Sequence, residues 1–422
     1  MRKTILAVAL SALTFGINAK EVQKPDAEFI QKVAQVGITQ ANWDSGKAAK
    51  LTIKNAYRFT HHVELSKGEY THDIGQASGF DLNSMTAQDF DGEQPMSVIL
   101  RDRLNQESLV ILKNGQLVDE YYWSGMHKDH SHLMMSVTKS FTSMTLATLA
   151  NDGLVDMNAL ITEYVPELKA SPAYAKATVQ EVADMRSGVL VKGINGKSWD
   201  ERMTNIQEWN GANAYPEITT VAEFGALLGA RDDVNSGEVY DYQCVNTEML
   251  GMVITSVTDK TTSEVMEEKL WKKVGFESNA YMQTNSVGEA VASGGLNATT
   301  RDVARMMDVL VNDGKNRRGE QIVPKAFVDN LITGNADVKS AWSKGKESKM
   351  VSDAWYKDQI RTFNVDGHKF LAFVGIHGQV VIGEPSTGIV LAMTGAQDER
   401  ESHRTVSMTF LDVVPTLLTA LK

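Results

Sequence analysis

The order of apolar and polar positions divides the chain into segments of different predicted structure. Residues 20–105 alternate without a sustained period and contain turns rich in Gly, Asp and Ser, which indicates an irregular N-terminal region that wraps around the rest. Two apolar, β-branched runs within residues 108–123 flank Asn114 and Gly115, a dipeptide that favours the positive φ angles of a tight hairpin. After a polar loop, a long apolar run predicts a helix that ends before Gly153.

The later segments change from helical to mixed patterns. Helical periodicity dominates residues 155–284, whereas the remainder alternates a Thr-capped helix, apolar strands between Gly and Pro turns, and a terminal helix at about 401–421. This order predicts an α+β fold, with an antiparallel sheet flanked by helices and an inserted, mainly helical subdomain. The N-terminal wrapping region is expected at residues 20–105. The sheet-and-helix part is expected at residues 106–154 and 285–422, and the helical subdomain at residues 155–284.

The first residues resemble a secretory signal. A basic start is followed by an apolar run too short to span a bilayer and by Ala19, after which we expect cleavage. No later segment approaches 18 uninterrupted apolar residues, so we expect no transmembrane segment. The formal net charge of -11 argues against a nucleic-acid partner. A periplasmic or secreted protein is the expected product, and Cys244, the only cysteine, excludes an intramolecular disulfide.

Ser136 and Lys139 stand in the apolar run HLMMSVTKSFTSM, where an ammonium is costly without partners. Three residues apart on a helix, the two side chains share one face, so the lysine nitrogen can act as base for a serine nucleophile. We expect burial to lower the pKa of the lysine. Ser343 and Lys346 have the same spacing in a lysine-rich segment expected to be a solvated loop, and they provide an internal control. The segment alone fits a catalytic pair and a lysine that extends to the surface equally well.

The remaining motifs resemble those of the serine β-lactamase and penicillin-recognising family, in its class C and esterase branch, over roughly residues 90–420. The S-x-x-K motif of that family is matched by Ser136 and Lys139. A tyrosine followed nine residues later by a glycine is matched by YQCVNTEMLG, which starts at Tyr242, and the glycine that ends a strand is matched by Gly375 in FVGIHGQ. The phrases SVTKSF, DMRSGV and GIHGQ are similar to 6-aminohexanoate-dimer hydrolases and family VIII-type esterases.

This resemblance implies a β-lactamase-like fold and a role for each matched residue. Ser136 would be the nucleophile, Lys139 its base, and Tyr242 the group that passes the proton to the leaving group. The backbone amides of Ser136 and Ile376, beside Gly375, would hold the oxyanion. A water molecule would then resolve the acyl-enzyme, with no metal or organic cofactor.

Four further residues could lie in or near the site, and the sequence supports a different interpretation for each. His377 fits a pocket-lining role or a strand histidine bonded to the backbone, and Trp199 fits a substrate-facing aromatic or a packing residue. Tyr240 replaces Tyr242 in the motif if the register differs by two. Cys244 is expected to be a small buried filler and not a nucleophile, since no His and Asp arrangement surrounds it.

A run of histidines offers a competing interpretation. His127, His130 and His132 could supply imidazoles to a zinc ion. The expected further ligands do not follow in the sequence, so we expect a polar loop beside the site and no metal.

Two departures from the family bear on the substrate. Cys244 stands where class C β-lactamases have an asparagine, and Phe373 stands where they have the lysine that binds the β-lactam carboxylate. The linear-amide hydrolases of this branch rely on a tyrosine in the loop after MRSGV, and residues 190–199 contain none.

We therefore expect a serine hydrolase of small-molecule esters or amides, an esterase in preference to a β-lactamase. Two alternatives remain open. One is a catalytically weak penicillin-binding or peptidoglycan-sensing module of the same fold, and the other is a β-lactamase or linear-amide hydrolase. The sequence predicts no particular oligomeric state.

Overall fold

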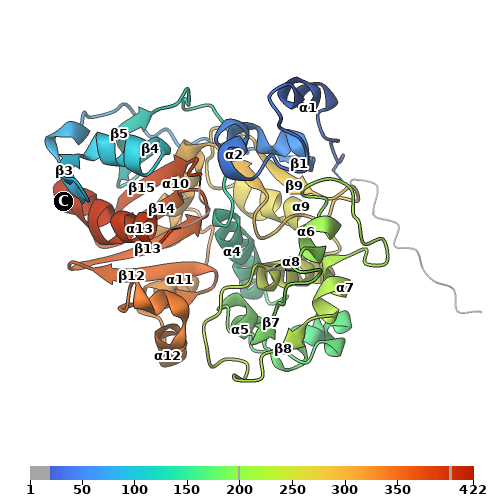
Figure 1. Cartoon of the computed structure of the whole chain (residues 1–422). Coiled ribbons are helices and arrows are strands. Elements are labelled where there is room, and N and C mark those ends of the chain that lie inside the picture. Colours follow the sequence, from blue (N-terminus) through green and yellow to red (C-terminus); the bar gives the residue numbers. More distant parts are fainter. Residues whose placement is uncertain (1–19, 198–199, 399–401) are drawn as a thin grey trace, which may run out of the picture.

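A seven-stranded antiparallel sheet forms one half of the protein, seen in the computed structural model of Figure 1, which describes residues 20–197, 200–398 and 402–422. The predicted signal at residues 1–19 and Trp199 lie outside the described residues. In spatial order the strands of the sheet are β11 (Ala354–Lys357), β12 (Ile360–Val365), β13 (His368–Gly375), β14 (Gln379–Glu384), β15 (Ile389–Gly395), β4 (Gln106–Lys113) and β5 (Gln116–Tyr122).

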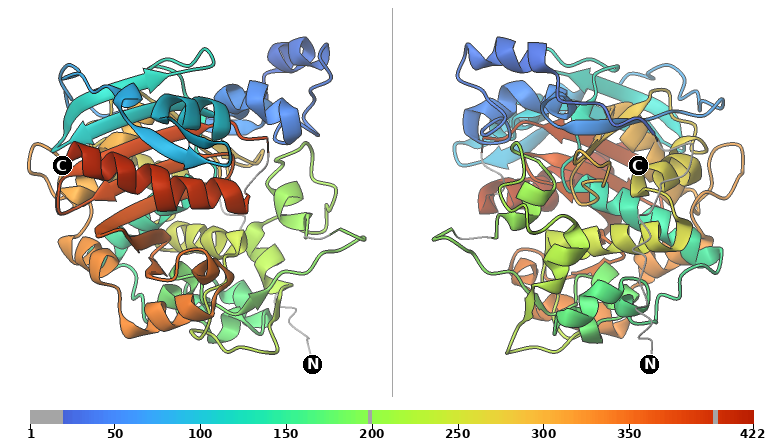
Figure 2. Two further views of the ribbon diagram at one scale, coloured as in Figure 1. Left: turned by 60° about the vertical axis from the view of Figure 1, so that its left-hand side comes forward. Right: turned by 90° about the vertical axis from the view of Figure 1, so that its right-hand side faces the viewer.

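Both faces of this sheet are buried, which explains the continuous apolar runs of its strands. In β15, Val390 and Ala392 join the core on the side of helix α10 (Thr300–Val311), whereas Ile389 and Leu391 join the core on the side of α14 (Val414–Leu421). The left view of Figure 2 shows the C-terminal helices lying across one face of the sheet. Alternate residues therefore serve two separate cores, as the two-residue period of a strand requires.

Several local predictions are confirmed. The β4–β5 hairpin turns at Asn114 and Gly115, whose φ angles are 52° and 78°. Helix α10 is capped by the Thr299 side chain, which accepts a hydrogen bond from the Asp302 amide. The expected C-terminal helix is present as α13 (His403–Met408) and α14.

Two long helices connect the sheet to the helical subdomain. Helix α4 (Val137–Asn151) lies in the middle of the molecule and contacts β13 and β14 on one side and α8 (Cys244–Thr258) on the other (Figure 1). As predicted, α4 ends just before Gly153, which has a φ angle of 77°. The other helices of this half are short, namely α5 (Val179–Ala183), α6 (Arg202–Ile206), α7 (Val221–Ala226) and α9 (Thr262–Met266).

The N-terminal region is more regular than its sequence pattern indicated. It contains α1 (Ala27–Ala34), α2 (Gly46–Thr52) and β1 (His61–Leu65). Strand β1 pairs with β9 (Ala280–Thr284), which lies inside the segment predicted as mainly helical. These two strands belong to a second, four-stranded sheet completed by β10 (Leu296–Ala298) and β6 (His132–Leu133). Pairing between segments more than 200 residues apart leaves no local periodicity, so the sequence pattern could not indicate it.

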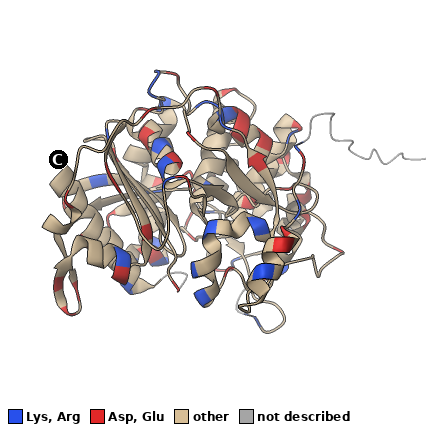
Figure 3. Cartoon of the chain, turned by 90° about the horizontal axis from the view of Figure 1, so that it is seen from above, with Lys and Arg blue, Asp and Glu red and all other residues tan. Residues whose placement is uncertain are grey.

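Three further helices lie outside these groups. Helix α12 (Ala336–Lys344) packs on the edge strand β11, α11 (Lys325–Thr333) contacts β12 and β13, and α3 (Met96–Val98) lies in the N-terminal region. In the view of Figure 3, Lys and Arg positions lie among Asp and Glu positions and do not form a separate face. Across the described part of the chain, none of the helices combines the length and the apolar character needed to span a bilayer.

Candidate active site

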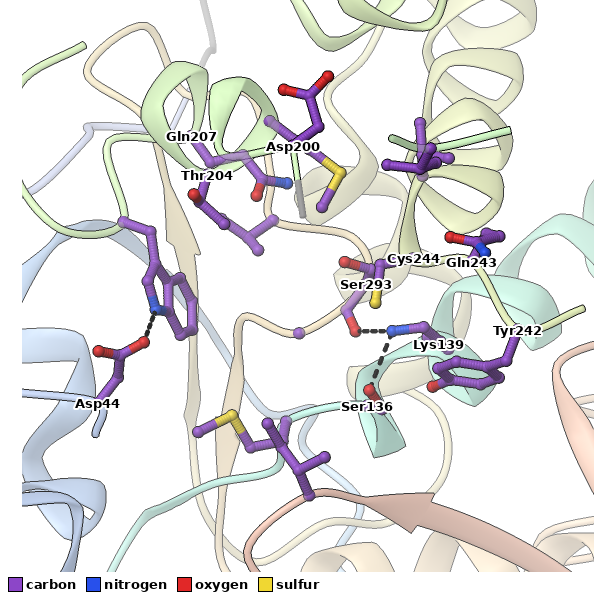
Figure 4. Close-up of a pocket in the computed structure, with 18 of the residues that line it drawn as sticks. Asp44, Ser136, Lys139, Asp200, Thr204, Gln207, Tyr242, Gln243, Cys244 and Ser293 are labelled. Atoms are coloured by element: carbon purple, nitrogen blue, oxygen red, sulfur yellow. Dashed lines mark hydrogen bonds between the residues drawn. The ribbon is translucent and has the colours of Figure 1, made fainter. Parts of the chain in front are cut away.

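Ser136 and Lys139 form a hydrogen-bonded pair at the start of α4. Ser136 is the residue that caps this helix, and Met135 before it has a φ angle of 47°, a left-handed conformation that β-branched and bulky residues rarely adopt. Lys139 is only 1% exposed, and its Nζ donates to Ser136 Oγ at 3.0 Å and to the Ser293 carbonyl oxygen at 2.7 Å (Figure 4). The lysine therefore does not extend to the surface.

Tyr242 completes a three-residue cluster. It lies just before α8, with its ring centroid 5.2 Å from Lys139 Nζ, and the neighbouring Ser136 side chain acts to lower the pKa of its phenol. The guanidinium carbon of Arg361 lies 5.1 Å from the same ring centroid. The structure thus brings Tyr242 beside Ser136 and Lys139, although it lies more than 100 residues after them in the sequence.

The end of β13 packs directly against the serine. A side-chain carbon at Gly375 would lie 2.6 Å from the Met134 carbonyl oxygen and 3.0 Å from the Ser136 amide nitrogen, closer than packed atoms allow. Only glycine permits this approach. Ile376, the next residue, lines the cavity in front of Ser136.

A cavity of about 330 Å³ opens in front of the cluster. Its wall combines the start of α4, the loop after β13, the helical subdomain and part of the N-terminal region. The lining is mainly apolar, with Met135, Val191, Met203, Trp209, Phe224, Val245, Val291 and Ile376. This size and lining suit a small, largely apolar group.

The N-terminal region contributes a wall that the sequence did not indicate. Asp44 lines the cavity, and its carboxylate accepts hydrogen bonds from Trp209 Nε1 at 2.8 Å and Asn210 Nδ2 at 3.1 Å. Trp43 is fully buried and donates from its indole nitrogen to the Trp209 carbonyl. Figure 4 shows Asp44 on the opposite side of the cavity from Ser136 and Lys139. A segment distant in sequence from the motifs therefore shapes the site.

The prediction that the pKa of Lys139 is lowered is wrong. Burial disfavours the ammonium form of Lys139, as expected. The acidic groups of Cys244, Tyr242 and Glu248 favour it more strongly, so the pKa of Lys139 is raised. Burial also raises the pKa of Tyr242, although the charge of Lys139 opposes this. Both groups are consequently protonated at neutral pH.

Several candidate residues lie away from the cavity. His377 is 1% exposed, has a φ angle of 65°, and donates from Nδ1 to the Gln397 carbonyl at 2.7 Å. Tyr240 is buried among aromatic rings and donates to Glu347 at 2.7 Å. Ser343 is exposed near the end of α12, not in a loop as expected. None of these three is among the described residues that line the cavity.

Two of the three histidines of the polar loop lie side by side. The ring centroids of His127 and His130 are 3.5 Å apart, with the ring planes tilted by 32°. His132 is buried on β6, with Nε2 3.5 Å from a carboxylate oxygen of Glu107. Among the described residues, no group of three or more His, Cys, Asp and Glu side chains is arranged to hold a metal ion.

Cys244 lies in the cavity wall and is half-buried, so it is more accessible than the buried filler expected from the sequence. We expect iodoacetamide to inactivate the protein, because a carboxamidomethyl group on this thiol would fill space beside Ser293 and Lys139. Mass spectrometry should find one modified site, and a saturating competitive ligand should slow its formation. The Cys244→Ala variant should resist the reagent, and inactivation of that variant at the same rate would contradict the placement.

The antiparallel sheet, the helical subdomain and the cavity at their junction define a β-lactamase-like α+β fold, as expected. A family model described as Beta-lactamase matches residues 82–408. The chain therefore belongs to the beta-lactamase family of hydrolases.

Individual relatives agree with this assignment. The 6-aminohexanoate-dimer hydrolase of Paenarthrobacter ureafaciens is 27% identical over 328 residues, which cover 74% of this chain and 80% of that protein. A Bacillus anthracis structure provisionally named as a 6-aminohexanoate-dimer hydrolase has a TM-score of 0.78 at 22% identity and covers 94% of this chain and 98% of its own. A family VIII carboxylesterase has a TM-score of 0.54 at 14% identity, over 71% of this chain and 90% of its own. At these identities the two solved structures show the fold alone.

Proposed function

We propose that the protein is a serine hydrolase that forms an acyl-enzyme on Ser136 with small, uncharged esters. The observation that carries this proposal is the 3.0 Å hydrogen bond between Lys139 Nζ and Ser136 Oγ at the floor of an apolar cavity. A buried lysine paired with a serine at a helix start, with a tyrosine beside the lysine in the same cavity, is an arrangement suited to nucleophilic catalysis. The family assignment supports the same reaction class.

The proposed reaction has two halves, the acylation of Ser136 and the hydrolysis of the acyl-enzyme, and Ser136, Lys139 and Tyr242 take part in both. Ser136 Oγ attacks the ester carbonyl while its proton passes to the unit formed by Lys139 and Tyr242. The amides of Ser136 and Ile376 stabilise the negative charge on the carbonyl oxygen. The same unit then protonates the leaving alcohol. In the second half it takes a proton from the attacking water and returns it to Ser136 Oγ as the acyl–oxygen bond breaks and the acid is released.

The cavity favours an uncharged acyl group over an anionic one. Among the described lining residues, Lys139 is the only Lys or Arg, and its ammonium already binds Ser136 and Ser293. Phe373 is fully buried in the core and packs against Phe141, so this position offers no charge to a ligand. Asp44 adds a carboxylate that would repel an anionic group. The site thus lacks a partner for the carboxylate of a cephalosporin.

A substrate panel tests this proposal. We expect a short-chain acyl ester to give the highest kcat/KM, a matched linear amide to give weak or no turnover, and a cephalosporin to give negligible turnover. Amides depend more than esters on protonation of the leaving group, and they belong in the panel because the Paenarthrobacter relative is named for hydrolysis of a 6-aminohexanoate dimer. A cephalosporin value equal to or above the ester value would contradict the proposed substrate class.

The pH dependence follows from the raised pKa values. Because Lys139 and Tyr242 are both protonated at neutral pH, the pair must lose one proton before it can accept one from Ser136. We therefore expect kcat/KM to rise with pH beyond neutrality, with one apparent pKa that belongs to the pair. The measurement is a pH profile of a stable ester with correction for spontaneous hydrolysis. A plateau already reached at neutral pH would mean that the lysine is a free amine there.

The location of this activity is also proposed. The basic and apolar residues before Ala19 support export to the periplasm or the medium. Fractionation of the producing cells would test it.

A further inference from the structure

Glu248 is a buried carboxylate inside the stretch YQCVNTEMLG, at a position to which the motif gives no role. It lies on α8, six residues after Tyr242, and is 1% exposed between the fully buried Met249 and buried Thr247. A carboxylate in such surroundings is costly unless it accepts hydrogen bonds or has a cation nearby. Its partners therefore indicate what it does.

The partners of Glu248 are two consecutive backbone amides. One carboxylate oxygen accepts from the Ala292 amide at 3.1 Å, and the other accepts from the Ser293 amide at 2.9 Å. The carbonyl of the same Ser293 accepts the 2.7 Å hydrogen bond from Lys139 Nζ. From the other side, Thr142 Oγ1 donates to the Ala292 carbonyl at 2.8 Å. The turn that holds the lysine is thus itself held by Glu248 and Thr142.

We propose, on the basis of the proposed function, that Glu248 is a positioning residue for the catalytic lysine. Its carboxylate fixes the Ala292–Ser293 turn, so that the Ser293 carbonyl keeps Lys139 Nζ beside Ser136 Oγ. The chain of contacts runs from α8 through the turn to α4, and every link is buried. A displacement of the turn would move the lysine away from the serine, and small displacements of a catalytic group cost large factors in rate.

Glu248 also places a negative charge near the lysine. The groups that face Lys139 and Tyr242 are the Ser136 hydroxyl on α4, Glu248 and Cys244 on α8, Tyr356 on β11, Arg361 on β12 and the Ser293 carbonyl. Of these, Glu248 is the carboxylate. Burial raises the pKa of Glu248, whereas the Lys139 charge and the Ser293 amide lower it, and the ionised carboxylate favours the ammonium form of Lys139. Removal of that charge should allow the pair to lose its proton at a lower pH. The pH profile of kcat/KM therefore reports two effects of Glu248 separately. Its positioning of Lys139 affects the height of the plateau, and its charge affects the pH at which kcat/KM rises.

The test compares Glu248→Gln with the wild type on the best ester of the panel. Gln has the same shape, but its amide NH₂ would face one of the two backbone N–H donors, and the charge is gone. We expect the plateau of kcat/KM to fall roughly 10- to 100-fold, as for other partners that orient a catalytic group. We also expect the rising limb of the profile to move to lower pH.

Thr142→Val separates position from charge. This variant loosens the opposite side of the turn and leaves Glu248 in place. We expect a smaller fall in kcat/KM and no movement of the limb. If Glu248→Gln does not fold, Thr142→Val still decides the positioning role, since unchanged kcat/KM in a folded Thr142→Val protein would contradict it.

Asp302→Asn is the matched control. Asp302 is a fully buried carboxylate that likewise accepts from two consecutive amides, those of Glu277 at 2.8 Å and Ser278 at 3.1 Å. Neither of these amides belongs to a residue of the cavity lining, whereas Ser293 does line the cavity. We expect the Asp302→Asn substitution to lower the melting temperature and to leave the rising limb of the pH profile of kcat/KM unchanged.

The possible outcomes separate this proposal from the proposed function. If wild-type protein hydrolyses the ester through Ser136, and folded Glu248→Gln keeps the wild-type plateau and limb, the positioning role is wrong and the serine mechanism stands. The same conclusion follows if Glu248→Gln and Asp302→Asn have the same effect, because Glu248 would then act on the fold alone. If wild-type protein is not acylated at Ser136, the proposed function itself fails.

Discussion

Replacement of Ser136 by alanine is expected to abolish ester hydrolysis while the protein remains folded. Ser136 Oγ is the only hydroxyl to which Lys139 Nζ donates within the described part of the chain, and it lies at the cavity floor. Its removal leaves the lysine without an attacking group beside it. By analogy with other serine enzymes, the loss in kcat should be on the order of 10⁴-fold or more. The measurement is kcat with the wild-type melting temperature as a check on folding.

The control for this variant is Ser343→Ala. Ser343 and Lys346 repeat the spacing of the pair, but both are exposed. We expect no change in turnover, because a solvated lysine gives no activation to a solvated hydroxyl. Retained activity in Ser136→Ala would place the nucleophile elsewhere and remove the basis of the proposed mechanism.

Lys139→Ala and Tyr242→Phe are expected to cause losses that are far from additive. Lys139 Nζ donates to the Ser136 hydroxyl, and the Tyr242 ring centroid lies 5.2 Å from that nitrogen. The two groups also act on each other's pKa, since an ionised Tyr242 raises the pKa of Lys139 and the Lys139 ammonium lowers the pKa of Tyr242. Each single variant removes general acid–base catalysis, which typically contributes about 10²- to 10⁴-fold. Once either the lysine or the tyrosine is replaced, the proton path is already broken. The kcat/KM of the double variant should therefore be only slightly below that of the less active single variant.

The measurement is a double-mutant cycle on kcat/KM. Losses that multiply would show that the lysine and the tyrosine act independently. Normal activity in Tyr242→Phe would be equally damaging, because Tyr240 is bonded to Glu347 among aromatic rings and cannot take its place without rearrangement.

Features that depend on nearby residues could be predicted from the sequence. The Asn114 and Gly115 turn, the Thr299 cap and the end of α4 before Gly153 each follow from the conformational preference of one or two residues. The gathering of Ser136, Lys139, Tyr242 and Ile376 around one cavity could be expected only because their motifs resemble a known family.

Features that depend on distant pairing could not be predicted. Strands β1 and β9 pair although they lie more than 200 residues apart in the sequence, and Asp44 reaches the cavity because Trp43 packs against Trp209. Neither contact leaves a periodic signal in its own segment.

The predicted lowering of the Lys139 pKa was wrong for a related reason. Burial alone lowers the pKa of a lysine, but the net direction depends on Cys244, Tyr242 and Glu248, whose positions are set by the fold. A signal for Glu248 was present, since an acidic residue in the apolar helix VNTEMLGMVI is as conspicuous as Lys139 in its own helix. A buried charge needs a partner at either position, so the sequence also marks Glu248 as a candidate for a buried, partnered group.

The acyl-enzyme itself provides the most direct test of the central claim. Protein mixed with excess activated ester is quenched in acid within the first turnovers, and its mass is measured before and after proteolysis. The account predicts a mass gain of one acyl group, located on the peptide that contains Ser136 and absent from Ser136→Ala. Turnover accompanied by an acyl group on another residue, such as Cys244, would contradict it.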